Sequence, residues 1–105
     1  MDGFVRAQWQ APAGVQAFTT TRLGPGVSLP PFDAFNLGDH VGDDAAAVAS
    51  NRVALHRALD LPSEPLWLRQ MHGTHVVDAN TVASSEIPEA DAAVTRQPGR
   101  VLAIL

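Results

Sequence analysis

Hydrophobic and polar positions alternate with different periods along the chain, and each period predicts one kind of element. Residues 15–21, VQAFTTT, are rich in strand-favouring residues and alternate between two faces, which predicts a strand. Residues 24–31, GPGVSLPP, consist largely of Gly and Pro, which interrupt regular structure. We therefore expect a loop there, ordered or mobile, directly after the first strand.

A helix is predicted where Asp43 and Asp44 precede the sequence AAAVASNRVALHRAL. Aspartate at a helix start accepts hydrogen bonds from free backbone amides and interacts favourably with the positive end of the helix dipole. We expect the helix to run from about Asp44 to Leu59 and to be closed by Leu61-Pro62. One face would carry Val48, Arg52, Leu55 and Leu59.

A hairpin is predicted further on, where two apolar segments flank Gly73-Thr74. Leu66–Met71 would form one strand and Val76–Ala79 the other, because Gly at the first central position suits a type II′ turn. His72 and His75 would then face each other with β-carbons about 5 Å apart. Turn chemistry alone would account for two neighbouring imidazoles.

The last five residues, Val101–Leu105, form an apolar run typical of a strand buried on both faces. Such a strand needs further chain to cover it, so we expect residues 1–105 to be the N-terminal part of a single longer domain. With one helix among several strands, the fold class expected is α+β.

Composition narrows the classes of protein. Apolar residues make up 46% of the chain and charged residues 17%, which is typical of a globular protein. The net charge is −4 and the chain has no lysine, which argues against a nucleic-acid or anionic-membrane surface. It also has no cysteine, and its N-terminus does not resemble a signal peptide. We expect a cytoplasmic protein of undetermined oligomeric state.

His72 is the strongest candidate for chemistry, because a neutral imidazole can bind a metal or transfer a proton near neutral pH. Together with His75 it still lacks the third ligand that a catalytic zinc ion needs. A hydrogen-bonded hairpin histidine is the alternative interpretation. His56 lies on a mostly polar side of the predicted helix, and His40 lies in a loop, where a turn residue is the simpler interpretation.

Other polar residues also have two interpretations each. Arg22, next to the Gly-rich loop, could hold a phosphate or be a surface charge. Asn36 and Gln70 could read a nucleobase edge or satisfy local backbone groups. Asp43 and Asp44 are caps or acid-base groups, and Asp91 makes a turn or takes part in chemistry.

A set of motifs in fixed order is more specific than any single residue. The motifs are Phe18-Thr19-Thr20-Thr21-Arg22, Gly26-Val27-Ser28, Pro31-Phe32, Asn36-Leu37-Gly38, His40-Val41-Gly42-Asp43-Asp44, Asn51-Arg52, Trp67-Leu68-Arg69-Gln70-Met71-His72-Gly73 and Ala90-Asp91-Ala92. Their order resembles the N-terminal half of the YfiH family, also called the polyphenol oxidase or laccase-domain family. The resemblance covers nearly the whole chain.

The resemblance implies an α/β/β/α layered fold and a metal-dependent purine nucleoside phosphorylase, with adenosine deaminase and methylthioadenosine phosphorylase activities also reported. The metal, usually described as zinc although copper was proposed earlier, is held in the family by two histidines and one cysteine. Only the first ligand motif is present, as Gln70-Met71-His72-Gly73, with Met in place of Val. His72 thus corresponds to a ligand and catalytic residue, and the other two motifs would follow Leu105.

From this resemblance we expect purine nucleoside and phosphate as substrates. The residues expected to contact them are Arg22, Ser28, Asn36, Gln70 and Asp91. Arg22 and the loop Gly26–Ser28 would contribute to an anion pocket. We expect the isolated chain to be inactive and to hold zinc weakly. Two alternatives are a non-catalytic α+β binding module and a copper-dependent polyphenol oxidase.

Overall fold

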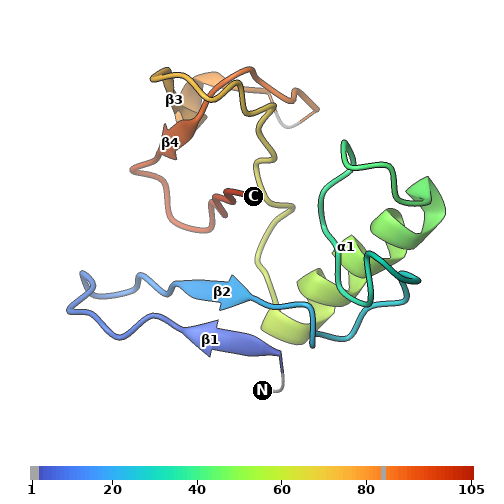
Figure 1. The fold of residues 1–105 in the computed structure, drawn as a ribbon. Helices are drawn as coiled ribbons and strands as arrows, with labels where there is room; N and C mark the ends of the chain where they lie inside the picture. The colour runs from blue at the N-terminus through green and yellow to red at the C-terminus, as the bar shows by residue number, and fades with distance from the viewer. Residues whose placement is uncertain (1–2, 84) are drawn as a thin grey trace. The chain divides into compact units, whose positions relative to one another are not determined.

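The computed structural model describes residues 3–83 and 85–105, which form two compact units divided between Ala58 and Leu59 (Figure 1). The first unit contains strands β1 (Phe4–Arg6) and β2 (Phe18–Thr20) and all but the last residue of helix α1 (Ala45–Leu59). The second contains strand β3 (Val76–Asp78), the short 3₁₀ helix η1 (Ala79–Thr81) and strand β4 (Ala92–Val94). This mixture of helix and strands confirms the α+β class.

Strands β1 and β2 form an antiparallel pair in the first unit. Arg6 lies opposite Phe18 in the register, and its guanidinium carbon is 4.9 Å from the centre of the Phe18 ring. Such a cation–π contact between facing residues stabilises a short ladder. The strand predicted over residues 15–21 is therefore present but shorter, and its partner β1 was not predicted. The predicted loop over residues 24–31 does lack regular structure.

Helix α1 follows the prediction closely, since it runs from Ala45 to Leu59. The side chain of Asp44 accepts a hydrogen bond from the backbone N–H of Ala46 at 3.3 Å, which is the capping role expected of it. Asp60, just after the last helical residue, adopts a φ of +48° in the left-handed region. This conformation ends the helix before Leu61-Pro62.

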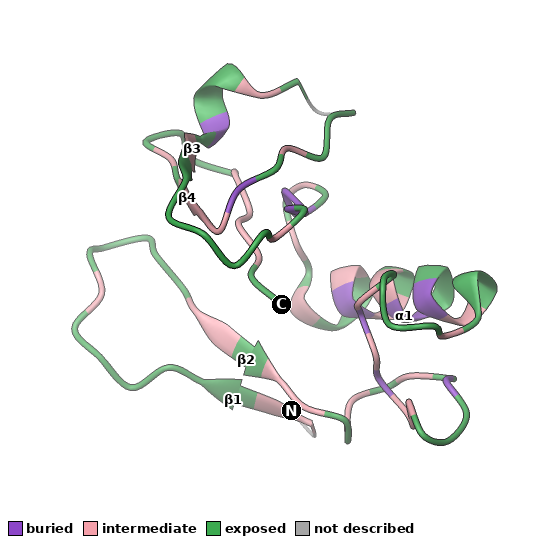
Figure 2. Ribbon diagram, turned by 45° about the horizontal axis from the view of Figure 1, so that its top comes forward, coloured by how far each residue is buried: buried purple, intermediate pink, exposed green. Residues whose placement is uncertain are grey.

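Buried positions recur along helix α1 (Figure 2), and only part of the predicted face is among them. Val48 and Leu55 are buried as expected, but the residue between them on that face is Asn51, which is 0% exposed. Arg52 and Leu59 are half-buried. Phe35 and Leu37 are also buried apolar side chains of the first unit. Gly24 is required beside Phe35, because a β-carbon at position 24 would overlap the Phe35 ring.

The predicted hairpin in the second unit is wrong. Strand β3 pairs with β4, and the pairing is parallel, with Val76 opposite Ala92 and Asp78 opposite Val94. Residues 66–71 form only isolated parallel bridges, Leu66 with Leu102 and Arg69 with Glu89. The physical reason is that the backbone N–H groups after Gln70 bond to a side chain, that of Asp91, and not to a facing strand.

A small apolar cluster holds the second unit together. Leu66, Leu68, Ala79 and Ala90 are buried in it, and Val77, Val82, Ala93 and Leu102 pack against it. The expectation of a strand over Val101–Leu105 buried on both faces is also wrong. Leu102 alone forms a bridge in that run, and the exposed fractions of Ile104 and Leu105 are 58% and 55%. In residues 3–83 and 85–105, no helix has the length and apolar character needed to cross a membrane.

Candidate functional site

The backbone around His72 is held by one carboxylate. Asp91 Oδ1 accepts hydrogen bonds from the N–H groups of Met71 at 2.8 Å and His72 at 2.7 Å. Its second oxygen, Oδ2, accepts from the N–H of Gly73 at 2.9 Å. Three consecutive amides thus donate to a single side chain. We call residues 71–75 the His72 loop.

Asp91 is itself fixed by the start of strand β4. Its backbone N–H donates to the carbonyl of His75 at 2.9 Å, and that of the preceding Ala90 donates to the carbonyl of Arg69 at 3.1 Å. Ala90 is only 1% exposed, within the apolar cluster of this unit. The Asp91 carboxylate therefore extends from a packed backbone toward the His72 loop.

The amides also stabilise the ionised form of Asp91. Burial raises the pKa of the carboxyl group, but the N–H groups of Gly73, Met71 and His72 lower it, and an electrostatic interaction with the His72 side chain adds to the lowering. The net result is a pKa below the ordinary value of 3.8. Asp91 is therefore an anion near neutral pH and accepts these three hydrogen bonds.

His72 has an unusual backbone conformation, with a φ of +57°. Residues other than glycine rarely adopt this left-handed conformation, because the β-carbon crowds the backbone. Both His72 and His75 have exposed side chains. The two imidazoles do not face each other across a ladder, as the hairpin required, because β3 begins after His75 and pairs with β4.

An exposed imidazole on a fixed loop fits one coordination position of a metal ion. Within residues 3–83 and 85–105, however, no group of three His, Cys, Asp or Glu side chains lies close enough together to hold one. The described residues therefore do not supply all three ligands of the centre implied by the family resemblance. The donor chemistry of His72 suits either zinc or copper.

A second polar cluster lies in the first unit and joins the loop at Ser28, the segment from Asn36 to Asp43, and helix α1. Asp43 Oδ2 accepts hydrogen bonds from the Ser28 hydroxyl at 2.5 Å and from the Asn36 amide at 3.1 Å. Asn51 donates through Nδ2 to Ser28 Oγ and to the Asn36 carbonyl, both at 2.8 Å. Asn51 Oδ1 accepts from the backbone N–H of Val27 at 2.8 Å.

This cluster brings together two predicted substrate-binding residues, Ser28 and Asn36, with Asp43. The Ser28 hydroxyl, and to a smaller extent the Asn36 amide and the Asp44 N–H, lower the pKa of Asp43 below 3.8, against an increase from burial. Asn51 belongs to the quoted motif Asn51-Arg52 but was not predicted to be a site residue. Its signal was a polar amide within the apolar face of a helix, where asparagine is otherwise unfavourable.

The loop Gly26–Ser28 does not offer free backbone donors to an anion. The N–H of Gly26 donates to the carbonyl of Gly24, and that of Ser28 to the carbonyl of Ala34. The N–H of Val27 is bound to Asn51. A phosphate contact in this region would fall to the side chain of Arg22.

Arg22 is an exposed side chain with a partner of its own. Its Nε donates to the carbonyl of Asp33 at 2.8 Å, and its Nη2 pairs with the Asp33 carboxylate at 3.0 Å. In the second unit, the amide oxygen of Gln70 accepts a hydrogen bond from the backbone N–H of Leu105 at 2.8 Å. Both predicted roles in substrate binding remain predictions.

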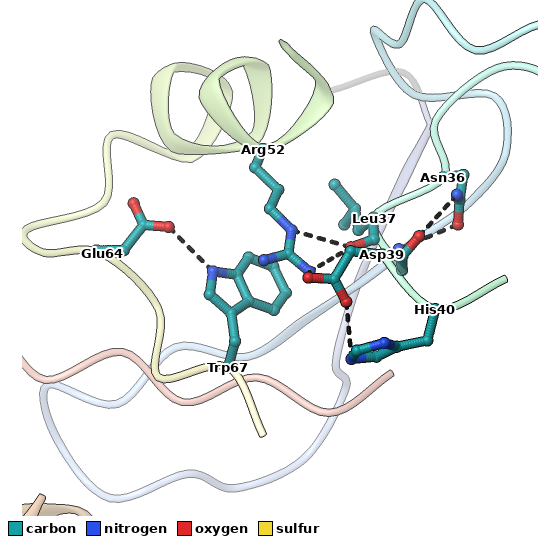
Figure 3. Close-up of polar contacts among 8 residues, drawn as sticks. Asn36, Leu37, Asp39, His40, Arg52, Glu64 and Trp67 are labelled. Atoms are coloured by element: carbon teal, nitrogen blue, oxygen red, sulfur yellow. Dashed lines mark hydrogen bonds and ion pairs between the residues drawn. The ribbon is translucent and has the colours of Figure 1, made fainter. Parts of the chain in front are cut away.

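The other two histidines have structural surroundings. His40 Nε2 lies 3.0 Å from the carboxylate of Asp39 (Figure 3). Close to this pair, Arg52 donates two hydrogen bonds to the carbonyl of Leu37, at 2.8 and 3.0 Å. His56 is half-buried on α1, where a solvated residue was expected. In the second unit, the indole N–H of Trp67 donates to Glu64 at 2.9 Å (Figure 3).

Comparison with known proteins identifies the family. Residues 16–105 match the family model described as multi-copper polyphenol oxidoreductase laccase. The chain belongs to this family. Similar curated members include the purine nucleoside phosphorylase of Xylella fastidiosa, 51% identical over 106 residues, and the purine nucleoside phosphorylase YfiH of Escherichia coli, 44% identical over 105 residues.

Two solved structures are similar in fold to this chain. A protein of Neisseria meningitidis shares 40% identity and a TM-score of 0.86, and YlmD of Geobacillus stearothermophilus shares 30% identity and a TM-score of 0.75. Each alignment covers 97% of this chain, but only 40% and 43% of the two structures. The alignments to the two curated relatives cover 94% and 100% of this chain and 41% and 42% of the relatives. The chain thus spans about two fifths of its relatives.

Proposed function

We propose that this chain is the N-terminal part of a cytoplasmic, metal-dependent purine nucleoside phosphorylase in which His72 is a metal ligand. The observation that supports the proposal most directly is the exposed imidazole of His72 on a loop whose three amides are tied to Asp91. The names of the curated relatives supply the reaction class. The other ligands would come from residues outside these 105.

In this reaction the bond between the ribose C1′ and the purine nitrogen breaks, and a bond between C1′ and a phosphate oxygen forms. A bound zinc or copper ion would supply Lewis-acid chemistry at the site. His72 would hold the metal through a ring nitrogen. Arg22, with an exposed guanidinium, is proposed to bind phosphate.

Ser28, Asn36, Gln70 and Asp91 are proposed to have supporting roles. Ser28 and Asn36 fix the conformation around Asp43, and Asp91 fixes the His72 loop. Gln70 immediately precedes that loop, and its amide nitrogen is proposed to donate a hydrogen bond to the nucleoside. Adenosine and methylthioadenosine belong among the substrates to be tested, the former for deamination as well.

The test uses the complete protein encoded by the gene, supplied with inosine, adenosine or methylthioadenosine and with phosphate. Wild-type protein should release the free base and ribose 1-phosphate and should contain bound zinc or copper. His72→Ala should lower both metal content and turnover by at least tenfold. His75→Ala is the matched control, because His75 is another exposed histidine of the same loop and should keep both within twofold.

Two outcomes would contradict the proposal. If His72→Ala retained full metal content and turnover, His72 would not be a ligand. If the protein oxidised polyphenols with copper and released no base from any nucleoside, the polyphenol oxidase suggested by the family description would be the better assignment.

A separate Arg22→Ala variant tests the proposed phosphate contact. It should raise the KM for phosphate with little change in kcat, and an unchanged KM would show that Arg22 does not bind phosphate.

A further inference from the structure

The contact between Asp91 and the His72 loop has a geometry that a simple surface turn does not require. The two oxygens of one carboxylate accept three consecutive backbone N–H groups, those of Met71, His72 and Gly73, over distances of 2.7–2.9 Å. Hydrogen bonds to an ionised acceptor are stronger than those between neutral groups. Three of them in a row restrict the direction of three successive peptide planes.

Those peptide planes determine where the His72 side chain starts. The N–H of His72 belongs to the peptide plane before its α-carbon, and the N–H of Gly73 belongs to the plane after it. With both N–H groups bound to Asp91, the two dihedral angles of His72 are defined together, including its φ of +57°. The bond from α-carbon to β-carbon therefore has one direction, and only the side-chain torsions of His72 stay adjustable.

The residue type at position 91 matters for this arrangement. Three donors need several acceptor lone pairs spread over two oxygens. A carboxylate has two acceptor oxygens, whereas an asparagine amide has only one. The backbone of Gly73 also lies close to the Asp91 carboxylate. A β-carbon on Gly73 would lie 3.3 Å from Asp91 Oδ2, so that even alanine at position 73 would press on the carboxylate.

We propose that Asp91 is a positioning residue that holds His72 in its left-handed conformation and so directs its imidazole toward the metal. This inference rests on the proposed function of His72. Asp91 acts through the backbone, as an anion with its oxygens already accepting hydrogen bonds. Outer residues that orient a ligand commonly change metal affinity by 10- to 100-fold when they are replaced.

The experiment compares zinc affinity, measured by competition with a chromophoric chelator, in variants of the complete protein. Asp91→Asn should lower zinc affinity about 10- to 100-fold. It should also change the visible absorption spectrum of the cobalt-substituted protein and speed hydrogen exchange at the amides of the His72 loop. Asp78→Asn is the matched control, because Asp78 is another carboxylate of the second unit that accepts a backbone N–H, that of Asn80 at 2.9 Å. Asp78→Asn should leave the affinity and the spectrum unchanged.

Gly73→Ala is the second variant and serves also if Asp91→Asn fails to fold. It keeps every donor and acceptor but displaces the carboxylate, and we expect a shifted cobalt spectrum. Zinc affinity within twofold of wild type in Asp91→Asn, or an unshifted spectrum in Gly73→Ala, would overturn the inference. An equal loss in Asp91→Asn and Asp78→Asn would overturn it too, because the effect would then be general destabilisation.

The variant His72→Ala separates this inference from the proposed function. If His72→Ala abolishes tight zinc binding while Asp91→Asn retains it, the proposed function stands and the positioning role of Asp91 is wrong. If zinc affinity is unchanged in His72→Ala, the proposed function itself is wrong.

Discussion

Replacing Asn51 by leucine should be among the most destabilising single changes in the first unit. Asn51 is 0% exposed and makes three hydrogen bonds, to the Val27 N–H, the Ser28 hydroxyl and the Asn36 carbonyl. Leucine has the same number of side-chain heavy atoms and the same branching point, and its methyl groups are bulkier than the amide atoms, so the change removes hydrogen bonds without leaving a cavity. The experiment therefore tests chiefly the polar contribution of this side chain.

The magnitude follows from the groups that lose a partner. The Val27 N–H and the Asn36 carbonyl are left without Asn51, whereas Ser28 still donates to Asp43. A buried polar group without a partner costs about 1–3 kcal/mol. Two such groups, both only partly buried, give an expected loss of about 3 kcal/mol. A whole domain of this size is stable by only about 5–15 kcal/mol.

Urea-induced unfolding, followed by far-ultraviolet circular dichroism of the helix, measures this loss. Asn80→Leu is the matched control, since Asn80 is exposed and its replacement should change the free energy of unfolding by less than about 0.5 kcal/mol. Equal stability of Asn51→Leu and the wild-type protein, to within the same margin, would refute the view that Asn51 joins the loop to the helix.

Three further predictions concern single residues. The folded-state pKa of Asp43 is lowered below 3.8, chiefly by the Ser28 hydroxyl, so Asp43 contributes stability that is present above about pH 4 and lost as the pH falls through that folded-state pKa. In Asp43→Asn the free energy of unfolding should therefore decrease less on acidification than in the wild-type protein. The same pH dependence in both proteins would contradict this. Asp60→Gly should raise the free energy of unfolding by about 0.5–1 kcal/mol, because glycine adopts the left-handed conformation at the helix end more readily. A lower melting temperature than that of the wild-type protein would contradict this. His72→Gly should be about 1 kcal/mol more stable than His72→Ala for the same reason, and equal melting temperatures would argue against the φ of +57°.

Local sequence patterns were sufficient to predict elements that depend on contacts between residues close together in the sequence. Helix α1 lies where the Asp44 cap and the following helix-forming sequence predict it, because capping and helical hydrogen bonds join residues a few positions apart. The breaker-rich loop over residues 24–31 was predicted for a similar reason. The ordered set of motifs from Phe18 to Ala92 was also sufficient to indicate the family, since residue types in a fixed order can be recognised without knowledge of how they pack.

Pairing over longer distances could not be predicted from the pattern. Gly73-Thr74 suits a two-residue hairpin turn, yet Asp91 accepts the N–H groups of the preceding residues and of Gly73, and β3 pairs in parallel with β4. No period in the sequence indicates that a carboxylate nearly twenty positions away is the acceptor. Parallel neighbours are joined by long crossovers, whose destination depends on packing.

The sequence by itself determined the helix, the loop over residues 24–31 and the family, because each depends on residue types at short spacing or in a fixed order. The tertiary structure alone decided which groups accept the hydrogen bonds of those residues. Asn51 became the centre of a buried cluster and Asp91 the support of His72. The physical reason is that every polar group enclosed by folding must find a partner, and that partner is chosen by proximity in space.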